Sequence, residues 1–219
     1  MNVRPLALLS WLCLMAPAAG WSQGPAAPLP EGELKELLAL QGDAARGRSL
    51  FARCEVCHRK DGAGRVNGWT PRLAGQHASV LLKQVADIRS GRRANPEMQP
   101  LVAAPVLTLA QIADVVAYLQ ALPVSAANGK GPGTQLERGQ QLYAKDCMAC
   151  HGAKGEGDAG RFVPAVAAQH HEYLLREVIA IRDGTRGNSN PEMVKVVKDY
   201  GPADIEAVAD HMSRLAPVK

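Results

Sequence analysis

The sequence predicts an all-α protein that consists of one helical unit repeated in tandem. The pentapeptide Cys-x-x-Cys-His occurs at Cys54–His58 and again at Cys147–His151, 93 positions later. Apolar residues recur at helical spacing after each copy, and no stretch alternates apolar and polar residues as a half-buried strand would. The chain has 219 residues, which is enough for one or two domains.

Two helices are predicted after each pentapeptide. The apolar stripe of the first is Leu81, Val85 and Ile88 in one repeat and Leu174, Val178 and Ile181 in the other. The stripe of the last helix is Ile112, Val115, Leu119 and Leu122, matched by Ile205, Val208, Met212 and Leu215. Gly91 and Gly184 are typical helix-ending residues. Thr108 with Gln111 predicts a capping box, and Pro202 suits a first helical turn.

A short helix is also predicted before each pentapeptide. Gly47 and Phe51 in the first repeat match Gly139 and Tyr143 in the second, which contains a one-residue insertion. Residues 33–40 are expected to add one more short helix. The stretch from 123 to 134 is rich in glycine, alanine and proline, and therefore predicts a linker.

The cysteine pattern predicts two covalently attached haem c groups. Apart from Cys13, every cysteine lies in a Cys-x-x-Cys-His motif, the spacing at which two thiols add to one porphyrin and the histidine binds its iron. The predicted haem-binding residues are Cys54, Cys57, His58, Cys147, Cys150 and His151. Disulfides or a zinc ribbon could also use four cysteines, but neither needs the histidines or the long repeat. Only 4% of the residues are aromatic, so porphyrins would also enlarge thin cores.

A second axial ligand is predicted from an Asn-Pro-Glu-Met sequence in the loop between the last two helices of each repeat. It places Met98 and Met193 as candidate ligands of the two irons. A thioether opposite a histidine favours reduced iron and raises the potential. The alternative is ligation by two histidines through His77 and His170, which also repeat. Because each of these precedes a predicted helix, capping or surface roles are the expectation for them.

These motifs resemble the class I cytochrome c domain, and the tandem resembles the di-haem cytochrome c4 family. The resemblance is carried by the two haem motifs, the later methionines and three further patterns. These are Pro71-Arg-Leu-Ala-Gly-Gln76, Gln84…Arg89-x-Gly91-x-Arg93 and Asp114…Ala117-Tyr118-Leu119. The second repeat departs at Val166-Ala-Ala-Gln169 and His211, and Arg59 stands where Gly152 follows the second motif. The resemblance implies two closely packed domains with neighbouring haem edges that pass electrons to a respiratory partner.

The N-terminus resembles a secretory signal peptide, with Arg4 before an apolar run and small residues near Gly20. A retained anchor is the alternative. We expect a signal peptide over 1–20, an extension over 21–40, a first domain over 41–123, a linker over 124–133 and a second domain over 134–219. Export would place the protein in the bacterial periplasm, where it would meet the membrane only through its partners.

The charge is distributed unevenly between the two repeats. Residues 41–123 hold eleven Lys and Arg against six Asp and Glu, whereas residues 134–219 hold eleven against twelve. A basic first domain could steer docking to an acidic partner, or it could simply be a solvated surface. No basic stripe interleaved with aromatic residues suggests nucleic acid.

The leading functional hypothesis is a non-enzymatic carrier that moves single electrons between redox proteins, because two six-coordinate irons leave no open site. The expected partners are a quinol-oxidising complex and a terminal oxidase, or a dehydrogenase. One alternative is the cytochrome subunit of a periplasmic dehydrogenase. The other is a di-haem peroxidase-type enzyme, which would need an open or displaceable iron site.

Overall fold

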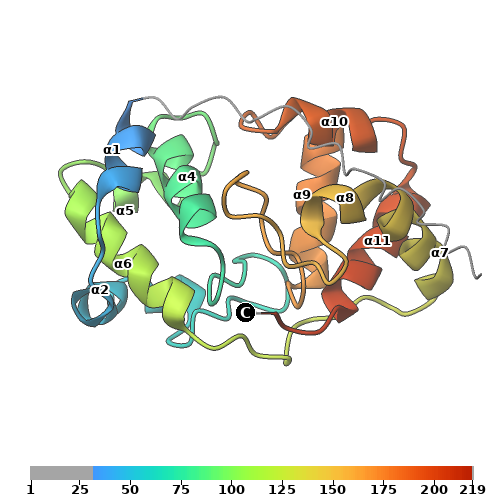
Figure 1. Cartoon of the computed structure of the whole chain (residues 1–219), viewed down its shortest axis with the longest axis horizontal. Helices are drawn as coiled ribbons and strands as arrows, with labels where there is room; N and C mark the ends of the chain where they lie inside the picture. The colour runs from blue at the N-terminus through green and yellow to red at the C-terminus, as the bar shows by residue number, and fades with distance from the viewer. Residues whose placement is uncertain (1–31, 219) are drawn as a thin grey trace, which may run out of the picture.

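The computed structural model describes residues 32–218, and these form an all-α fold in two groups of helices (Figure 1). The first group comprises α1 (Glu33–Ala39), α2 (Ala44–Phe51), α3 (Glu55–His58), α4 (Ala78–Arg89), α5 (Gln99–Val102) and α6 (Leu109–Ala121). The second comprises α7 (Leu136–Leu142), the π-helix η1 (Tyr143–Cys147), α8 (Met148–His151), α9 (His171–Arg182), α10 (Pro191–Val197) and α11 (Pro202–Arg214). The described part of the chain contains one isolated β-bridge, between Asp158 and Val163, and no strand. The predicted fold class is confirmed. The expected signal peptide lies outside the described residues.

The helix before each pentapeptide crosses the last helix of its own group at a glycine. A Cβ on Gly47 of α2 would lie 1.9 Å from the carbonyl oxygen of Asp114 in α6. A Cβ on Gly139 of α7 would lie 2.1 Å from the carbonyl oxygen of Ala207 in α11. Only glycine permits such a close approach of two helix backbones, so the repeated glycine sets the same helix crossing in both groups.

The helix ends follow the signals in the sequence. The side chain of Thr108 accepts a hydrogen bond from the backbone N–H of Gln111, and the Gln111 side chain accepts one from the Thr108 N–H. This capping box satisfies two of the free N–H groups at the start of α6. Pro202 occupies the first turn of α11. Gly91 and Gly184 follow α4 and α9 with φ of 76° and 70°, the left-handed conformation that ends many helices.

The one-residue insertion of the second repeat is absorbed as a π-helix. Seven positions separate Gly47 from Cys54, and eight separate Gly139 from Cys147. In the second repeat, η1 continues directly from α7 and ends at Cys147, so the extra residue lies inside a wider turn. A single π-helical turn is the usual way to insert one residue without breaking a helix. The helix therefore runs without a break from α7 into the second pentapeptide.

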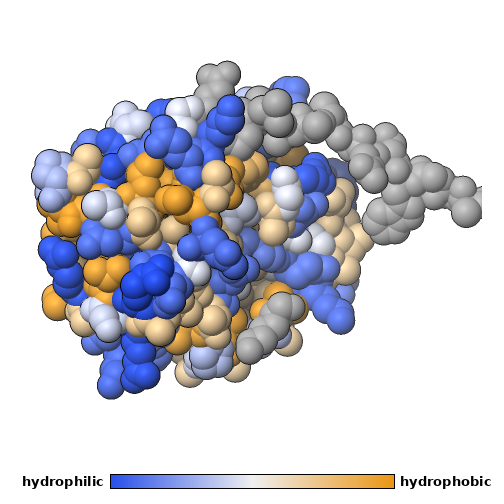
Figure 2. Space-filling view, turned by 60° about the vertical axis from the view of Figure 1, so that its left-hand side comes forward, coloured by the Kyte–Doolittle hydropathy of each residue, from blue (hydrophilic) through white to orange (hydrophobic). Residues whose placement is uncertain are grey.

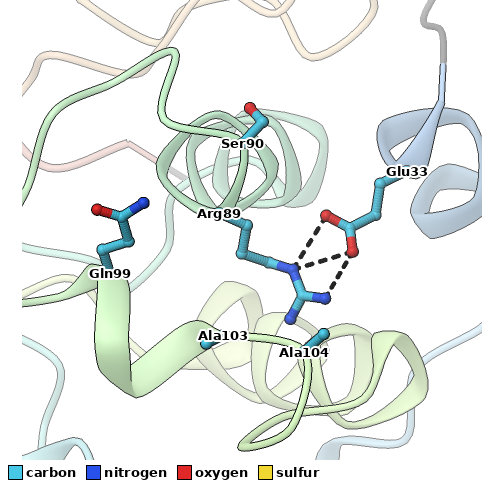
Figure 3. Close-up of a pocket in the computed structure, with 6 residues that line it drawn as sticks. All are labelled: Glu33, Arg89, Ser90, Gln99, Ala103 and Ala104. Carbon is cyan, nitrogen blue, oxygen red and sulfur yellow. Dashed lines mark hydrogen bonds and ion pairs between the residues drawn. The ribbon is translucent and has the colours of Figure 1, made fainter.

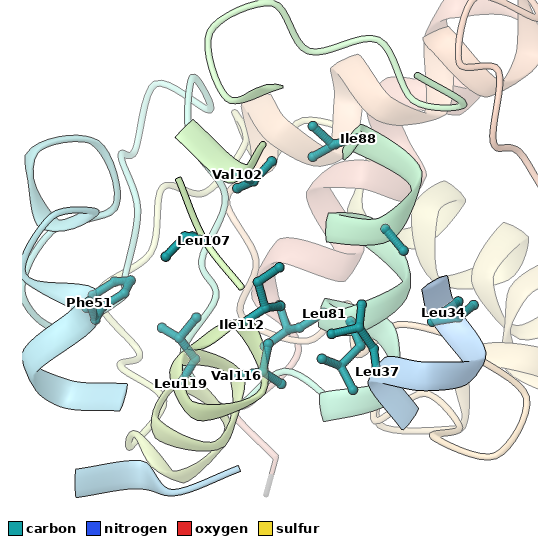
Figure 4. Close-up of a cluster of buried hydrophobic side chains, with 12 residues drawn as sticks. Leu34, Leu37, Phe51, Leu81, Ile88, Val102, Leu107, Ile112, Val116 and Leu119 are labelled. Atoms are coloured by element: carbon teal, nitrogen blue, oxygen red, sulfur yellow. The ribbon is translucent and has the colours of Figure 1, made fainter. Parts of the chain in front are cut away.

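Each group encloses its own apolar core. In the first group, helices α1, α2, α4 and α6 contribute Leu37, Phe51, Leu81 and Ile112 to one buried cluster (Figure 4). Leu37 is completely buried, which shows that α1, the helix without a counterpart in the second repeat, is part of this core. Burying a side chain of this size stabilises the fold by about 1.5–3 kcal/mol.

The repeated arginine at the end of the first long helix holds the segment that precedes the last helix. In the first group, the Arg89 guanidinium donates to the carbonyl oxygens of Val102 and Leu107 and pairs with Glu33 of α1 (Figure 3). In the second group, Arg182 donates to the carbonyl oxygen of Tyr200, the position equivalent to Leu107. The pocket of about 300 Å³ beside Arg89 is lined by α1, α4 and α5 and contains no cysteine. It is therefore separate from the haem motif.

None of the helices within residues 32–218 is long and apolar enough to cross a membrane.

Candidate haem-binding sites

The first Cys-x-x-Cys-His motif forms a single helical turn directly after α2. Cys54 is the N-cap residue of α3, and its thiol borders the apolar core. The carbonyl oxygen of Cys57 accepts a hydrogen bond of 2.9 Å from the Thr70 hydroxyl, which ties the motif to the following loop. Gly64, with φ of 73°, closes that loop by donating its N–H to the carbonyl oxygen of His58.

The second motif has the same construction at the end of η1. Cys147 is buried in the core of its group, whereas Cys150 is exposed. Gly157, with φ of 74°, donates its N–H to the carbonyl oxygen of His151, as Gly64 does for His58. Burial raises the pKa of the Cys147 thiol to about 12 and also raises that of Cys54, so both thiols are neutral at pH 7.

Each motif histidine lies beside a proline of the following loop, Pro71 for His58 and Pro164 for His151. Nδ1 of His151 lies 3.0 Å from the carbonyl oxygen of Pro164, which favours a proton on Nδ1 and leaves Nε2 free to bind a metal. In the first motif, the Pro71 carbonyl opposes the effect of burial on the pKa of His58, but His58 Nδ1 makes no hydrogen bond of normal geometry.

Both histidines are poised as neutral metal ligands. Burial lowers the pKa of His58 and of His151 below the ordinary value of 6.5, and the proline carbonyls only partly offset this effect. The neutral imidazole is the form that binds iron.

The two candidate methionines lie against the same cores as the cysteines. Met98 is half-buried at the N-terminus of α5 and packs on the core cluster that Cys54 also borders. Met193 is half-buried and packs on the cluster that contains Cys147. The expectation of a loop is wrong for Met193, which lies inside α10. Asn190 caps that helix and Pro191 occupies its first turn, so the Asn-Pro pair of the predicted loop begins a helix here.

The residues present fit two haem c groups. The four motif cysteines are free thiols, two in each group of helices, and each pair adjoins a histidine with a neutral imidazole. Within residues 32–218, no three His, Cys, Asp or Glu side chains converge in the way that a zinc ion requires.

The loops that follow the two motifs meet at the centre of the molecule and join the two groups of helices (Figure 1). The Gln76 side chain donates to the carbonyl oxygen of Ala165 and accepts from its N–H, both at 3.0 Å. Gln169 makes the same pair of bonds to Arg72, at 3.1 and 2.8 Å. Arg72 and Ala165 occupy the same position in the two repeats, so the contact has an approximate two-fold symmetry.

The repeated histidines belong to this interface and not to the helix caps. Nε2 of His77 lies 2.7 Å from the carbonyl oxygen of Glu156, and Nε2 of His170 lies 2.7 Å from that of Ala63, again equivalent positions. Neither side chain caps its helix, and His170 is 2% exposed. The expected capping or surface roles are therefore wrong. Sequence reasoning also missed the role of Gln76 and Gln169, although their repetition at one offset was visible.

Arg72 breaks the symmetry of the interface. Arg72 is 3% exposed, and its guanidinium donates to the carbonyl oxygens of Ala167 and Ala168 across the interface and of Ala74 within its own loop. Burial lowers its pKa to about 10, so it remains charged at neutral pH. The chain thus keeps one buried positive charge between its two haem motifs.

A second polar cluster joins the helices α4 and α9. Arg93 donates to Gln84 of its own group at 2.7 Å and pairs with Glu177 of the other at 3.0 Å. Arg186 mirrors it, pairing with Glu177 at 3.0 Å and donating to Gln84 at 3.1 Å. Gln84 and Glu177 are equivalent positions, so the repeated Gln84…Arg93 pattern belongs to the contact between the domains.

The fold and the two motifs together define a c-type cytochrome with two haem domains in one chain. The family model for cytochrome c matches the chain twice, at residues 44–123 and 136–216. The chain belongs to the cytochrome c family, and it is a di-haem protein of the cytochrome c4 type. Such proteins carry two covalently attached haem c groups and transfer electrons.

Several characterised proteins are similar over most of their length. A thiosulfate dehydrogenase electron acceptor of Stutzerimonas stutzeri is 33% identical over 82% of this chain and 90% of its own length. Cytochrome c4 of Pseudomonas aeruginosa is 32% identical over 80% of this chain and 89% of its own. The crystal structure of reduced cytochrome c4 from Pseudomonas stutzeri superposes with a TM-score of 0.72 at 27% identity, covering 80% of this chain and 99% of that one.

A solved thiosulfate dehydrogenase, TsdBA from Marichromatium purpuratum, contains a similar region. It superposes with a TM-score of 0.68 at 29% identity, over 77% of this chain but only 39% of that one.

Proposed function

We propose that this di-haem cytochrome is a periplasmic electron carrier without enzymatic activity of its own, in which both irons have histidine and methionine as axial ligands. The observation that carries the proposal is the convergence of one methionine and one Cys-x-x-Cys-His motif on each core. Met98 and Cys54 border the first core, and Met193 and Cys147 belong with the second.

In each domain, four residues would hold the cofactor. Cys54 and Cys57 would anchor the first haem, with His58 and Met98 on its iron. Cys147 and Cys150 would anchor the second, with His151 and Met193 on its iron. When bound, each haem supplies a one-electron iron couple, and methionine opposite histidine favours the reduced state. With both axial positions filled, the iron has no place for a substrate.

The chain's own residues would keep the two couples close and rigid. The Pro164 carbonyl orients the imidazole of His151, and the Gln76 and Gln169 bonds fix the two haem-motif loops against each other. Protein groups that are already fixed around the haems move little when an electron is gained or lost. The energy needed to reorganise the protein during electron transfer is therefore lower. This supports a relay between the haems within one chain.

Redox proteins are the partners of this kind of cytochrome. For this chain we propose a quinol-oxidising complex as donor and a terminal oxidase as acceptor. The periplasm is the proposed compartment, in agreement with the signal-like sequence at the N-terminus.

A second candidate is the electron-accepting subunit of a periplasmic dehydrogenase. Its support is the similarity to the electron acceptor of thiosulfate dehydrogenase in Stutzerimonas stutzeri and to the TsdBA structure. Co-purification of a dehydrogenase with the tagged chain from its own cells, and reduction of the chain by that enzyme and its substrate, would favour this candidate over the free carrier.

The carrier proposal is tested on the mature holoprotein. Mass spectrometry should give the mass of the processed polypeptide plus two haems, and a redox titration should show two one-electron steps. The reduced protein should not consume hydrogen peroxide catalytically. Peroxide turnover by the isolated protein would overturn the non-enzymatic assignment and favour the peroxidase type.

A further inference from the structure

The two haem motifs differ sharply in the side chains around them. Between positions 53 and 65, the first repeat carries four Lys and Arg against two Asp and Glu. The equivalent positions 146–158 carry one basic residue against three acidic ones. The reversals are direct: Arg53 stands where the second repeat has Asp146, and Arg65 where it has Asp158.

The first motif also exposes apolar surface beside these charges. Val56, between the two haem-anchoring cysteines, is 78% exposed, and Val66 and Trp69 are 59% and 52% exposed. The second repeat has the smaller Ala149 and Ala159 at the two valine positions. Figure 2 brings the α1, α2, α5 and α6 side of the first domain forward and shows hydrophobic side chains interspersed with hydrophilic ones there.

Arg65 joins these residues into one surface. Its guanidinium donates to the carbonyl oxygen of Val56 at 2.8 Å and lies over the Trp69 ring, 5.9 Å from the ring centre. A cation stacked on an aromatic ring keeps its charge accessible while its stem covers apolar surface. We call these four residues (Val56, Arg65, Val66 and Trp69), together with Arg59 directly after the motif histidine, the first-motif face.

Arg59, directly after the motif histidine, adds a further basic side chain, which pairs with Asp61 at 3.5 Å, and its backbone conformation is unfavourable. Its φ is 64° and its ψ 157°, a region that residues with a side chain rarely adopt. The second repeat has Gly152 at this position, with φ of 81°. Glycine adopts such angles freely, so the first repeat retains a basic side chain where the backbone alone would favour glycine.

We infer that the first-motif face is the docking surface for an acidic redox protein, so that electrons are exchanged with that partner at the first haem. Protein interfaces commonly have an apolar centre enriched in aromatic residues and arginine, surrounded by a polar rim. Here Val56, Val66 and Trp69 form the centre, and the basic side chains complement an acidic rim. Opposite charges would speed the encounter, and the acidic second motif would repel the same partner. The inference rests on the proposed function, because it assigns the partner of the same electron-transfer site.

The test uses the full mature holoprotein, labelled with nitrogen-15, and plastocyanin, an acidic blue-copper protein, as the probe. We expect amide shifts concentrated at positions 53–69, with no comparable cluster at 146–162, and an affinity that falls as salt screens the charges. The double variant Arg59→Glu/Arg65→Glu should bind plastocyanin about tenfold more weakly at low salt. Its matched control is Lys198→Glu, an exposed charge reversal in the second domain, which should leave the affinity unchanged.

A third variant, Trp69→Ala, tests the apolar centre and should weaken binding at low and high salt alike. Equal shifts in both domains, or equal losses in the double variant and in Lys198→Glu, would overturn the inference. Haem content and the absorption band of methionine-bound ferric iron are recorded on the same samples. Absence of two haems would defeat the proposed function, whereas loss of the docking pattern with both haems and the band intact defeats this inference alone.

Discussion

Gln76 and Gln169 make the same pair of hydrogen bonds in opposite directions across the contact between the domains. Each amide donates to and accepts from the backbone of one residue in the other repeat, Ala165 for Gln76 and Arg72 for Gln169. Both side chains are buried. The duplication therefore produced an internal two-fold contact, in which each haem-motif loop closes against the other.

Replacing Gln76 with alanine should loosen this contact. The N–H and the carbonyl oxygen of Ala165 would both lose their partner in a buried place, which costs about 1–3 kcal/mol for each group that stays unsatisfied. Hydrogen exchange of the Ala165 amide should become faster, and the protein should unfold at a lower temperature. Gln120→Ala, on the exposed face of α6, is the control and should change neither. Unchanged exchange at Ala165 would contradict the role of Gln76.

The crossing of α7 and α11 should not tolerate a methyl group. In Gly139→Ala the new Cβ would lie 2.1 Å from the Ala207 carbonyl oxygen, so the two helices must separate. We expect a loss of about 1–3 kcal/mol in the free energy of unfolding, as for other overpacked cores. Gly160→Ala is the matched control, because Gly160 lies in an exposed turn and its added Cβ would meet only the Asp158 side chain, at an ordinary contact distance of 3.4 Å. Denaturant unfolding of both holoproteins measures the difference, and equal midpoints would refute the close crossing.

The interface should weaken in acid through His170. Its Nδ1 accepts a hydrogen bond from the Gly129 N–H, and its Nε2 can then donate to the Ala63 carbonyl, an arrangement available only to the neutral ring. Burial lowers the pKa of His170 below its ordinary 6.5, and Arg72 and Arg59 lower it further, although the Ala63 carbonyl opposes them. The unfolded chain therefore binds this proton more readily than the folded protein does.

The contribution of His170 to stability is accordingly complete above the ordinary pKa and declines as the pH falls below it. Between about pH 7.5 and pH 5, the melting temperature of the wild-type holoprotein should fall further than that of His170→Gln. Melting curves recorded across this range provide the test. Parallel declines in the two proteins would show that His170 is not the group responsible.

Replacing one of the two ligand methionines should leave a coordination position free on one iron. In Met98→Ala the first haem would lose its sixth ligand, and in Met193→Ala the second would. Each variant should bind carbon monoxide at a single haem when reduced, and the lost thioether should lower the potential of that haem alone. Met212→Leu removes a methionine from the core of the second domain and should behave as the wild type. Carbon monoxide binding by Met212→Leu alone would show that the wrong methionine had been assigned.

The sequence was most informative where a local pattern determines local structure. The stripe at Leu174, Val178 and Ile181 predicted α9, and the Thr108–Gln111 box predicted the start of α6, because both depend on residues within a few turns. The insertion before Cys147 was also visible. Its outcome as a π-helix was not, since that depends on how α7 is fixed against α11.

The predictions that were wrong have two causes. One is the contact between the domains, and the other is the ambiguity of short motifs. His77 and His170 precede helices, so capping was the natural expectation, but their partners, the carbonyls of Glu156 and Ala63, are more than seventy positions away. Asn190-Pro191 fits both a turn and a helix start. Here the residues that follow form α10, which packs against the second core. Repetition of a buried polar residue at one offset was the available signal for the interface.

The central claim is that both irons are closed by histidine and methionine. Carbon monoxide added to the fully reduced wild-type holoprotein tests it most directly, because the gas binds ferrous haem only at an open or easily vacated position. The account predicts an absorption spectrum that stays that of a six-coordinate cytochrome at both haems. Ready formation of the carbon monoxide complex at both irons would contradict the assignment of Met98 and Met193, and with it the proposal of a pure electron carrier.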